Sequence, residues 1–462
     1  MRCRFEDQRE ARSRGIPAAL TPSKTEYQHP EIETLDRDGI VAIQRRKLKA
    51  LGERLAASRE WVEHFARADL RPSQLGDPEA FSCVPTLEKR DLRERYPFPF
   101  LTTPIDNVQR FVATSGTTGL PVLFGFSYRD VRDLMGPQMS RILRCAGVRP
   151  GERVYQGYGY GLWVGGVVMD WGLQAFGATN FGVGPGRAEL VAEWLRDHRY
   201  TVCTMSPLWL MTLVNTAKAK GIDPKRDWSL RVGLFGGQSI SAAFKHELES
   251  EMPEGFLAHN IYGATESGGP NLGISCPYSH GPDLMHLIND DSVLSEIIDP
   301  QTLEPVQPGE IGEIVITTLD KEASPVVRWR TRDLVRLADD PYGCPCGRRG
   351  LPLVGRIIGR SDDMLKIRGV LVFPSQVEDV IASHPLTVRE AWQIEVARGD
   401  RVLDEATVAV ERRAGTPVSR DDLARELQGM FRARLGIRFD VEVHDEGALP
   451  RYEAKAVRVI TK

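Results

Sequence analysis

Residues 114–119 combine hydroxyl side chains with glycines, a composition suited to holding phosphate groups. The loop follows the apolar residues 111–113 and reads Thr114, Ser115, Gly116, Thr117, Thr118 and Gly119. Glycines let the backbone bend closely around an anion, and hydroxyl groups donate hydrogen bonds to phosphate oxygens. The Gly-Lys-Ser/Thr ending of a Walker loop is missing. The composition predicts a phosphate-binding loop, with a simple polar turn as the alternative.

A second cluster places a hydroxyl group beside a carboxylate. Residues 262–266 follow Ile261, at the end of a predicted strand, and read Tyr262, Gly263, Ala264, Thr265 and Glu266. Mg²⁺ takes hard oxygen ligands and usually keeps substrate phosphates in its coordination shell. Thr265 and Glu266 could therefore hold Mg²⁺ and a phosphate oxygen together. The alternative for Glu266 is a glutamate that is simply solvated.

A carboxylate ends the basic strand of residues 329–333. Asp333 could accept two hydrogen bonds from the hydroxyl groups of a ribose. The alternative is an ion pair with Arg330 or Arg332.

Two more polar motifs lie towards the C-terminus. Residues 359–369 include Arg360 and Asp362, at a point where the composition of the chain changes. Residues 449–458 include Lys455, which could carry its charge to a transition state on a mobile lid.

Two cysteine-containing loops offer ligands for a metal ion. The first loop has Cys276 and His280, and the second has Cys344 and Cys346. Three thiolates and one imidazole suit a closed tetrahedral Zn²⁺ site. We expect a structural zinc ion between these loops, with His286 as an alternative to His280. The other cysteines are isolated and are predicted to be free or buried thiols.

These motifs need elements that present them. From residue 110 to 319, short apolar runs alternate with helix-like stretches, as in α/β architecture. Residues 232–235 predict a buried strand with Gly236 and Gly237 as its exit turn. The next helix, residues 241–251, would be capped by Ser239 or Ser241. Other predictions for this part are a helical pattern over about 31–66 and strands over 312–319 and 326–337.

The pattern changes after residue 360 to that of a small α+β unit. Its predicted elements are helices at 375–383 and 419–435, strands at 392–396, 406–411 and 439–443, and a hairpin turn at 398–400. We therefore predict a large N-terminal α/β domain over residues 1–359 and a small, mobile C-terminal α+β domain over residues 360–462.

Composition excludes several classes of protein. The chain has 462 residues, 41% hydrophobic and 27% charged, with a net charge of -3. This charge gives no field to attract a polyanion, so we expect no nucleic acid partner. The N-terminus lacks the apolar core of a signal peptide, and residues 157–169 are too few to span a bilayer, so a cytoplasmic location is expected. Seven cysteines, an odd number, argue against a secreted disulfide framework.

The order and separation of the five polar motifs resemble those of the adenylate-forming superfamily of acyl-CoA ligases, luciferases and peptide-synthetase adenylation domains. Within it, the chain is most similar to the phenylacetate-CoA ligase family, from about residue 27 to 462. The segments that carry this resemblance are residues 84–93 with 96–98, 158–162, 295–300 and 369–378.

The resemblance implies the adenylate-forming fold and an AMP-forming carboxylate-CoA ligase. Such an enzyme uses ATP and Mg²⁺ to make an acyl-adenylate and passes the acyl group to coenzyme A. Residues 114–119 would grip the β- and γ-phosphates, and Asp333 would bind the ribose. Thr265 and Glu266 would hold the α-phosphate and Mg²⁺. The resemblance also places Tyr262 and Gly263 in the nucleotide site.

The remaining roles are implied in the same way. Lys455 would stabilise the charge that builds during adenylation, Asp362 would be the hinge of the small domain, and Arg360 would lie near ribose and phosphate. Gly236, Gly237 and Gln238 stand where the family usually has a Gly/Ala-Glu pair against the adenine. Some relatives carry zinc between the two cysteine loops.

Two departures from the family pattern leave the required groups in place. Leu120-Pro121 replaces the commoner Lys-Pro, and the final motif reads Tyr-Glu-Ala-Lys where Ser-Glu-Gly-Lys is usual.

Aromatic residues predict a pocket for a planar aryl acid. The predicted lining is Tyr158, Tyr160, Trp163, Ser206, Trp209 and Ala264, with ordinary core packing as the alternative for each. No charged side chain is clearly placed to recognise an amino or hydroxyl substituent.

Two other functions remain open at this point. An adenylating ligase could pass the acyl group to an amine or a carrier-protein thiol, and a nucleotide-binding regulator could have lost catalysis. Glu266, Asp333 and Lys455 argue against the regulator. The oligomeric state is open, with a homodimer as one candidate.

Overall fold

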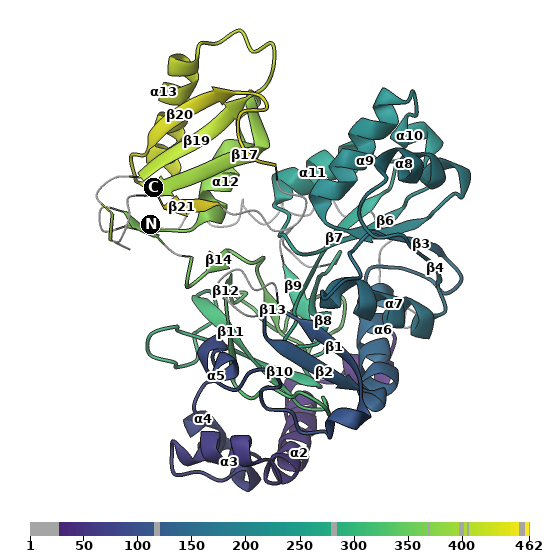
Figure 1. The fold of residues 1–462 in the computed structure, drawn as a ribbon, viewed down its shortest axis with the longest axis vertical. Coiled ribbons are helices and arrows are strands. Elements are labelled where there is room, and N and C mark those ends of the chain that lie inside the picture. The colour runs from purple at the N-terminus through teal and green to yellow at the C-terminus, as the bar shows by residue number, and fades with distance from the viewer. Residues whose placement is uncertain are drawn as a thin grey trace, which may run out of the picture.

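The chain forms two lobes in the computed structural model (Figure 1). The structure describes residues 27–114, 121–278, 284–363, 365–367, 370–396, 402–403, 406–451 and 458–461, and every structural statement below refers to these residues. We call described residues up to 363 the large lobe and those from 365 onward the small lobe. Each lobe has hydrophobic clusters of its own.

An eight-stranded sheet is the framework of the large lobe. Its strand order is β13-β9-β8-β7-β6-β5-β3-β4. The strands are β3 (Arg153–Gln156), β4 (Thr179–Gly182), β5 (Val202–Met205), β6 (Val232–Phe235), β7 (Leu257–Ala264), β8 (Gly269–Ser275), β9 (Met285–Leu287) and β13 (Leu353–Val354). Strands β3 to β7 run parallel, whereas β7, β8, β9 and β13 pair antiparallel. Strand β7 therefore joins the two halves.

Helices cover both faces of the parallel half (Figure 1). They are α6 (Gly136–Cys145), α7 (Val164–Phe176), α8 (Ala188–Asp197), α9 (Pro207–Ala219), α10 (Pro224–Asp227) and α11 (Ala242–Ser250). Neighbouring residues of one strand enter opposite clusters: Leu234 packs with α6 and α7, and Phe235 packs with α8, α9 and α11. Side chains alternate along a strand, so a strand that is buried on both faces has a continuous run of apolar residues in its sequence, as β6 does.

Two smaller sheets and the N-terminal helices complete the large lobe. Strands β1 (Val108–Ala113) and β2 (Leu123–Ser127) form a hairpin. A four-stranded antiparallel sheet contains β10 (Val293–Ile298), β11 (Ile311–Thr318), β12 (Trp329–Arg336) and β14 (Gly359–Arg360). The N-terminal helices are α1 (Pro30–Glu33), α2 (Arg37–Leu55), α3 (Arg59–Ala66), α4 (Pro78–Cys83) and α5 (Lys89–Arg93), and the shorter turns are Pro72–Gln74, Ile105–Asn107 and the π-helix Asp130–Met135.

The small lobe packs two helices against a mixed sheet. Its elements are β15 (Leu365–Ile367), β16 (Val370–Val372), α12 (Pro374–Ala382), β17 (Thr387–Val396), β18 (Val402–Leu403), β19 (Ala406–Arg412), α13 (Arg420–Leu435), β20 (Asp440–Asp445) and β21 (Val459–Thr461). The sheet order is β20-β19-β17-β21, with β15, β16 and β18 in a separate sheet. Figure 1 shows α12 on the side of the small lobe that faces α11.

The predicted fold class is confirmed, and most predicted elements are present. Ser241, not Ser239, caps α11, since its side chain accepts a hydrogen bond from the Phe244 amide. The helical pattern over 31–66 is divided into three helices, with Ser58 as the N-cap of α3. Strand β12, predicted over 326–337, starts three residues later than predicted, after Arg328, whose φ of 44° is left-handed and interrupts extended backbone.

The described helices include none with both the length and the apolar character needed to cross a membrane. The hairpin turn predicted at 398–400 lies outside the described residues, but its flanking strands β17 and β19 do pair antiparallel.

Candidate active site

The first group of candidate residues, 262–266, lies at the carboxyl end of β7. The Tyr262 hydroxyl donates a hydrogen bond of 2.7 Å to Asp333 Oδ2. A side chain at Gly263 would lie 1.8 Å from the carbonyl oxygen of Gly269, so only glycine fits where β7 turns into β8. The turn after Ala264 then carries Thr265 and Glu266. The hydrogen bond from Tyr262 joins the end of β7 to the strand that holds Asp333.

Asp333 lies on β12, which pairs with β14. It is paired across the sheet with Arg360, whose Nη1 is 3.4 Å from Asp333 Oδ1. Arg360 also donates two hydrogen bonds to Asp362, of 2.9 and 3.0 Å. Arg330 and Arg332, the alternative partners predicted for Asp333, form ion pairs with Glu313 and Glu88 respectively. One carboxylate of β12 therefore has an arginine beside it.

The charges of Asp333 and Arg360 affect the ionisation of the Glu266 carboxyl group. Burial raises the pKa of its carboxyl group, and the nearby Asp333 raises it further, whereas Lys89 and Arg360 lower it. Two carboxylates close together repel each other, and a bound cation would offset that repulsion. Hard carboxylate oxygens beside a hydroxyl side chain are a donor set that fits Mg²⁺.

The predicted phosphate loop begins at the end of β1. Thr114 Oγ1 accepts a hydrogen bond from the Val122 amide, and the Thr114 amide donates to the Val122 carbonyl oxygen. These bonds close the base of the loop. Ser115, Gly116, Thr117, Thr118 and Gly119 lie outside the described residues, and so does Lys455.

The exit turn of β6 lies against an aromatic side chain. A Cβ added at Gly236 would be 3.1 Å from the Tyr158 hydroxyl oxygen, and Gly237 has a left-handed φ of 80°. The next residue, Gln238, donates a hydrogen bond of 3.0 Å to Glu378 of the small lobe. The turn predicted to face adenine therefore also contacts the second lobe.

The six residues predicted to line the acid pocket do not all point to one place. Tyr158 reaches the end of β6, where its hydroxyl is 3.4 Å from the Leu234 carbonyl oxygen. Tyr160 instead donates to Asp170 Oδ1, at 2.8 Å, and Trp209 donates to the Tyr155 hydroxyl, at 3.0 Å. The remaining three are the N-cap residues Trp163 and Ser206 and the β7 residue Ala264.

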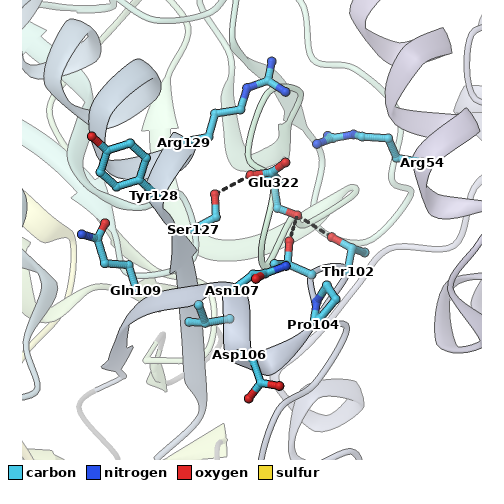
Figure 2. Close-up of a pocket in the computed structure, with 12 residues that line it drawn as sticks. Arg54, Thr102, Pro104, Asp106, Asn107, Gln109, Ser127, Tyr128, Arg129 and Glu322 are labelled. Atoms are coloured by element: carbon cyan, nitrogen blue, oxygen red, sulfur yellow. Dashed lines mark hydrogen bonds between the residues drawn. The ribbon is translucent and has the colours of Figure 1, made fainter.

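An open groove of about 840 Å³ lies at the other end of the β1–β2 hairpin (Figure 2). None of the predicted site residues is in its lining. The Glu322 carboxylate accepts a hydrogen bond from Ser127, and the Glu322 carbonyl oxygen accepts one from Thr102. The hydrogen bond between Ser127 and Glu322 thus joins the segment that follows β11 to the hairpin.

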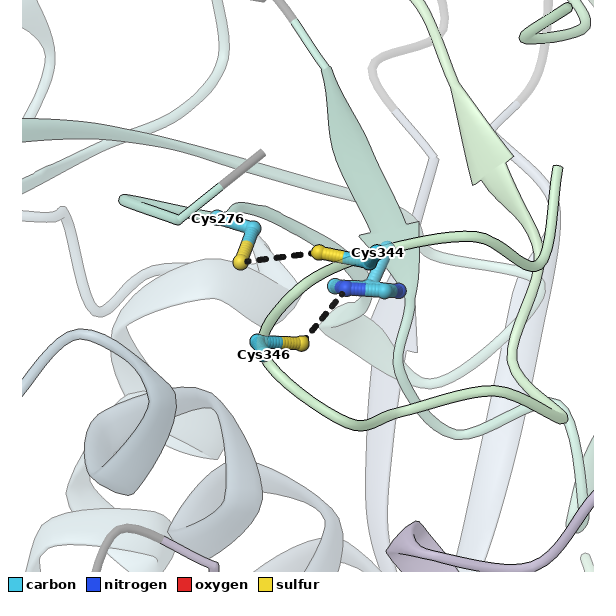
Figure 3. Close-up of side chains that lie close together, drawn as sticks. Cys276, Cys344 and Cys346 are labelled. Atoms are coloured by element: carbon cyan, nitrogen blue, oxygen red, sulfur yellow. Dashed lines mark hydrogen bonds between the residues drawn. The ribbon is translucent and has the colours of Figure 1, made fainter. Parts of the chain in front are cut away.

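The two cysteine loops meet as predicted (Figure 3). The cluster contains Cys276, Cys344 and Cys346 together with His286, and their four donor atoms lie within 4.8 Å of one another. The two sulfurs of Cys276 and Cys344 are 3.7 Å apart. A tetrahedral zinc site with Zn–S bonds of about 2.3 Å has S···S edges of roughly 3.8 Å. The predicted ligand His280 lies outside the described residues.

His286 is oriented as a metal ligand would be. Its Nδ1 lies 3.3 Å from the Leu351 carbonyl oxygen, and its Nε2 lies 3.2 Å from Cys346 Sγ. A hydrogen bond from Nδ1 to a carbonyl leaves Nε2 free to coordinate. Hydrogen bonds from Cys276 and Cys344, together with His286, lower the pKa of Cys346 and favour its thiolate. The donor set therefore fits zinc.

Three residues of this region have no role predicted from the sequence, although Glu378 ends the family segment 369–378. Lys321 is fully buried, and its Nζ lies 3.4 Å from the Glu266 carbonyl oxygen. Glu378 and Arg389 join the lobes through contacts with residues far away in the chain. Sequence gives no local signal for these contacts, because lysine, glutamate and arginine are usually exposed.

Comparisons with known proteins agree with this arrangement. Residues 102–319 match the family of AMP-binding enzymes, and residues 369–462 match the AMP-binding enzyme C-terminal domain. The phenylacetate-coenzyme A ligase of Escherichia coli (strain K12) is 35% identical over 437 residues, which cover 93% of this chain and 96% of the relative.

Solved structures share the fold of both lobes. A 2-hydroxyisobutyryl-CoA ligase in the postadenylation state, in complex with 2-HIB-AMP, aligns with a TM-score of 0.84 at 24% identity, covering 97% of this chain and 94% of that one. In the thioesterification state, the same ligase aligns with a TM-score of 0.67 at 25% identity over the same shares of the two chains. Since the sequence relationship extends over nearly the full length of both proteins, the chain belongs to the phenylacetate-coenzyme A ligase family and is an AMP-forming acid–thiol ligase that uses a carboxylic acid and coenzyme A.

Proposed function

We propose that the carboxylic acid activated by this ligase is aromatic. The aromatic ring of Tyr158 beside the exit turn of β6 supports this proposal, because a planar aryl group packs well against such a surface. The names of the relatives, phenylacetate-coenzyme A ligases, support it too. Phenylacetate is therefore the first acid to test.

The convergence of Tyr262, Asp333 and Arg360 is the observation on which the site assignment depends. Asp333 would bind the ribose hydroxyls, with Tyr262 and Arg360 holding its carboxylate in place. Gly236, Gly237 and Gln238 would face the adenine. Residues 114–119 would grip the β- and γ-phosphates, and Thr265 with Glu266 would hold Mg²⁺ and the α-phosphate. Bound Mg²⁺ would neutralise part of the triphosphate charge.

Two half-reactions follow from these roles. In the first, an oxygen of the acid attacks the α-phosphorus of ATP, a P–O bond forms, and the bond to the β-phosphate breaks as pyrophosphate leaves. Lys455 would stabilise the negative charge that develops. In the second, the thiolate of coenzyme A attacks the carbonyl carbon of the adenylate and a C–S bond forms. The bond from this carbon to the bridging oxygen breaks, and AMP leaves with that oxygen.

The two half-reactions would use different arrangements of the lobes. We place the domain boundary at residue 360 and the hinge at Asp362, whose carboxylate Arg360 holds through two hydrogen bonds. The higher TM-score with a postadenylation-state ligase than with a thioesterification-state ligase supports an arrangement that belongs to the first half-reaction.

A structural zinc ion is the second part of the proposal. Cys276, Cys344, Cys346 and His286 would hold it, and it would tie β8 and β9 to the loop after β12. Zinc in such a closed site adds folding free energy and takes no part in the reaction. A cytoplasmic location and a homodimer remain predictions from the sequence.

ATP–pyrophosphate exchange across a panel of acids tests the substrate. We expect phenylacetate or another aryl acid to give the fastest exchange. A panel in which only short aliphatic acids support exchange would contradict the aromatic pocket.

The acceptor and the role of Lys455 are tested next. With the best acid, coenzyme A should yield a thioester detected by mass, whereas an amine or a carrier protein should yield no acyl product. Lys455→Ala should suppress adenylate formation far more than thioester formation from a supplied adenylate. Equal losses in the two steps would contradict the role of Lys455.

A further inference from the structure

Lys321 is a charged side chain in a fully buried position next to the candidate active site. It is 0% exposed, and its Nζ lies 4.8 Å from the centre of the Phe126 ring and 5.1 Å from that of Phe124. Within the described part of the chain, no carboxylate oxygen is recorded within 4.0 Å of this nitrogen. Its hydrogen bond goes to the carbonyl oxygen of Glu266, at 3.4 Å.

The contacts of Lys321 connect the two segments that would handle the triphosphate. Phe124 and Phe126 point to the same face of β2, since they are two residues apart in a strand. That strand forms, with β1, the hairpin that carries the phosphate loop. Glu266, the proposed magnesium ligand, follows Thr265 in the turn after β7. The lysine therefore lies between the base of the phosphate loop and the proposed magnesium ligand.

The segment around Lys321 is held in place from several sides. Asp130 accepts hydrogen bonds from the amides of Glu322 and Ala323, at 2.6 and 3.0 Å. Arg54 donates to the carbonyl oxygen of Lys321 itself, at 3.2 Å. Figure 2 shows the bonds from Ser127 and Thr102 to Glu322. With its backbone fixed, Lys321 has little freedom to follow a movement of Glu266.

A buried ammonium group without a directly bound carboxylate costs free energy relative to an apolar side chain of similar shape. Burial also lowers the pKa of Lys321, to about 8. Methionine would fill the same space with no charge to desolvate. Stability of the fold therefore does not explain why a lysine occupies this buried position.

We propose that Lys321 is a positioning residue, which fixes the turn bearing Thr265 and Glu266 against the phosphate-loop hairpin so that the site is ready for Mg²⁺–ATP. This inference rests on the proposed role of Glu266. Lys321 acts through Glu266 and its neighbours and does not itself touch the reacting atoms. Its removal should therefore affect the use of Mg²⁺–ATP and leave the acid site and the second half-reaction intact.

Lys321→Met provides the first test, because it keeps the length of the side chain and removes the charge. We expect its unfolding temperature to equal or exceed that of the wild type. In pyrophosphate exchange with the best acid of the panel, kcat/KM for Mg²⁺–ATP should fall by about 10²-fold, the effect of a misplacement of about 1 Å in an active site. The KM for the acid should stay within about twofold, as for a distant site.

Lys47→Met is the matched control. Lys47 also contacts this segment, through an ion pair of 2.5 Å with Asp320, but it lies on α2. We expect it to lower the unfolding temperature and to leave kcat/KM for Mg²⁺–ATP unchanged. The two lysine variants should thus show opposite patterns of stability and activity.

Two further variants make the result decisive. Lys321→Gln keeps an N–H donor for the Glu266 carbonyl and should retain more Mg²⁺–ATP activity than Lys321→Met, and it serves as the main test if the methionine variant does not fold. Parallel losses of stability and of both half-reactions in the Lys321 variants would overturn the inference. So would wild-type use of Mg²⁺–ATP by Lys321→Met.

Glu266→Gln separates this inference from the proposed function. Wild-type exchange by Glu266→Gln would remove the proposed role of Glu266 and, with it, the basis for Lys321. Loss of exchange in Glu266→Gln together with normal Mg²⁺–ATP use in Lys321→Met would overturn the inference on Lys321 alone.

Discussion

The side-chain amide of Gln238 on the large lobe donates a hydrogen bond of 3.0 Å to the carboxylate of Glu378 on α12 of the small lobe. Burial raises the pKa of Glu378, although Arg458 and Arg389 lower it. By the family resemblance, glutamate is usual where this chain has Gln238. A second carboxylate there would face Glu378 at close range and repel it. The amide therefore suits the lobe contact.

Gln238→Glu should weaken that contact while keeping the size of the side chain. We expect pyrophosphate exchange to fall about tenfold at alkaline pH, which corresponds to one pKa unit of added repulsion. The loss should shrink as the pH is lowered, because protonation of either carboxyl group removes the repulsion. The double variant Gln238→Glu/Glu378→Gln should recover exchange. A double variant as slow as the single one would show that Gln238 acts on the nucleotide alone.

Arg389 makes another contact between the lobes. Its guanidinium lies 3.8 Å from the centre of the Phe244 ring and donates to Ser241 Oγ, at 3.0 Å, and to Glu247, at 3.3 Å. Arg389→Ala should lower the population of this lobe arrangement by about five- to thirtyfold, for a loss of about 1 to 2 kcal/mol. Adenylation should slow accordingly, and thioester formation from a supplied adenylate should not. Equal slowing of both steps would refute a role confined to this arrangement.

The cysteine cluster predicts a bound metal ion in the purified protein. Mass spectrometry of the metal content should find zinc, and Cys344→Ser should lower both the zinc content and the unfolding temperature. Cys145→Ala is the control, because Cys145 is also buried but is not among the clustered donors. It should keep its zinc. A wild-type protein purified without zinc and unaffected by added zinc would contradict the prediction.

His259 predicts a pH dependence of stability. This buried imidazole has its pKa lowered from 6.5 to about 4, by burial first and then by Lys245, while a hydrogen bond to the Ser275 carbonyl opposes the shift. The unfolded chain takes up the proton at higher pH than the folded one, so the stabilising contribution is present above pH 6.5 and is lost as the pH falls towards 4. At about 1.4 kcal/mol per pKa unit, the loss reaches about 3 kcal/mol.

Urea unfolding measures this effect. The free energy of unfolding of His259→Gln should fall less steeply between pH 6.5 and about 4 than that of the wild type. Identical slopes for the two proteins would mean that His259 does not titrate in this range.

The sequence predicts those features that local pattern determines. The apolar run of residues 232–235, followed by glycines and a capping serine, is enough to locate β6 and α11. The family resemblance places both Tyr262 and Asp333 in the nucleotide site. Their hydrogen bond joins two different sheets, since β7 and β12 do not belong to the same one.

Long-range packing decides the rest. No local pattern distinguishes the buried Lys321 from an exposed lysine after a strand, and nothing near Glu378 indicates that it meets Gln238. His286 is in the cysteine cluster because β9 pairs with both β8 and β13, which requires knowledge of the strand order. The direction of Tyr160 towards Asp170 likewise depends on packing.

The pairing of β13 with β9 also bears on how the chain is made. Leu353 and Val354 pair with His286 and Met285, so β9 obtains its outer neighbour only after a long intervening segment has been synthesised. A nascent chain that has emerged as far as β12 still presents β9 with an unpaired row of amide and carbonyl groups, a surface on which other chains can add strands. Premature termination before Leu353 should therefore yield an aggregating fragment and not a smaller soluble protein.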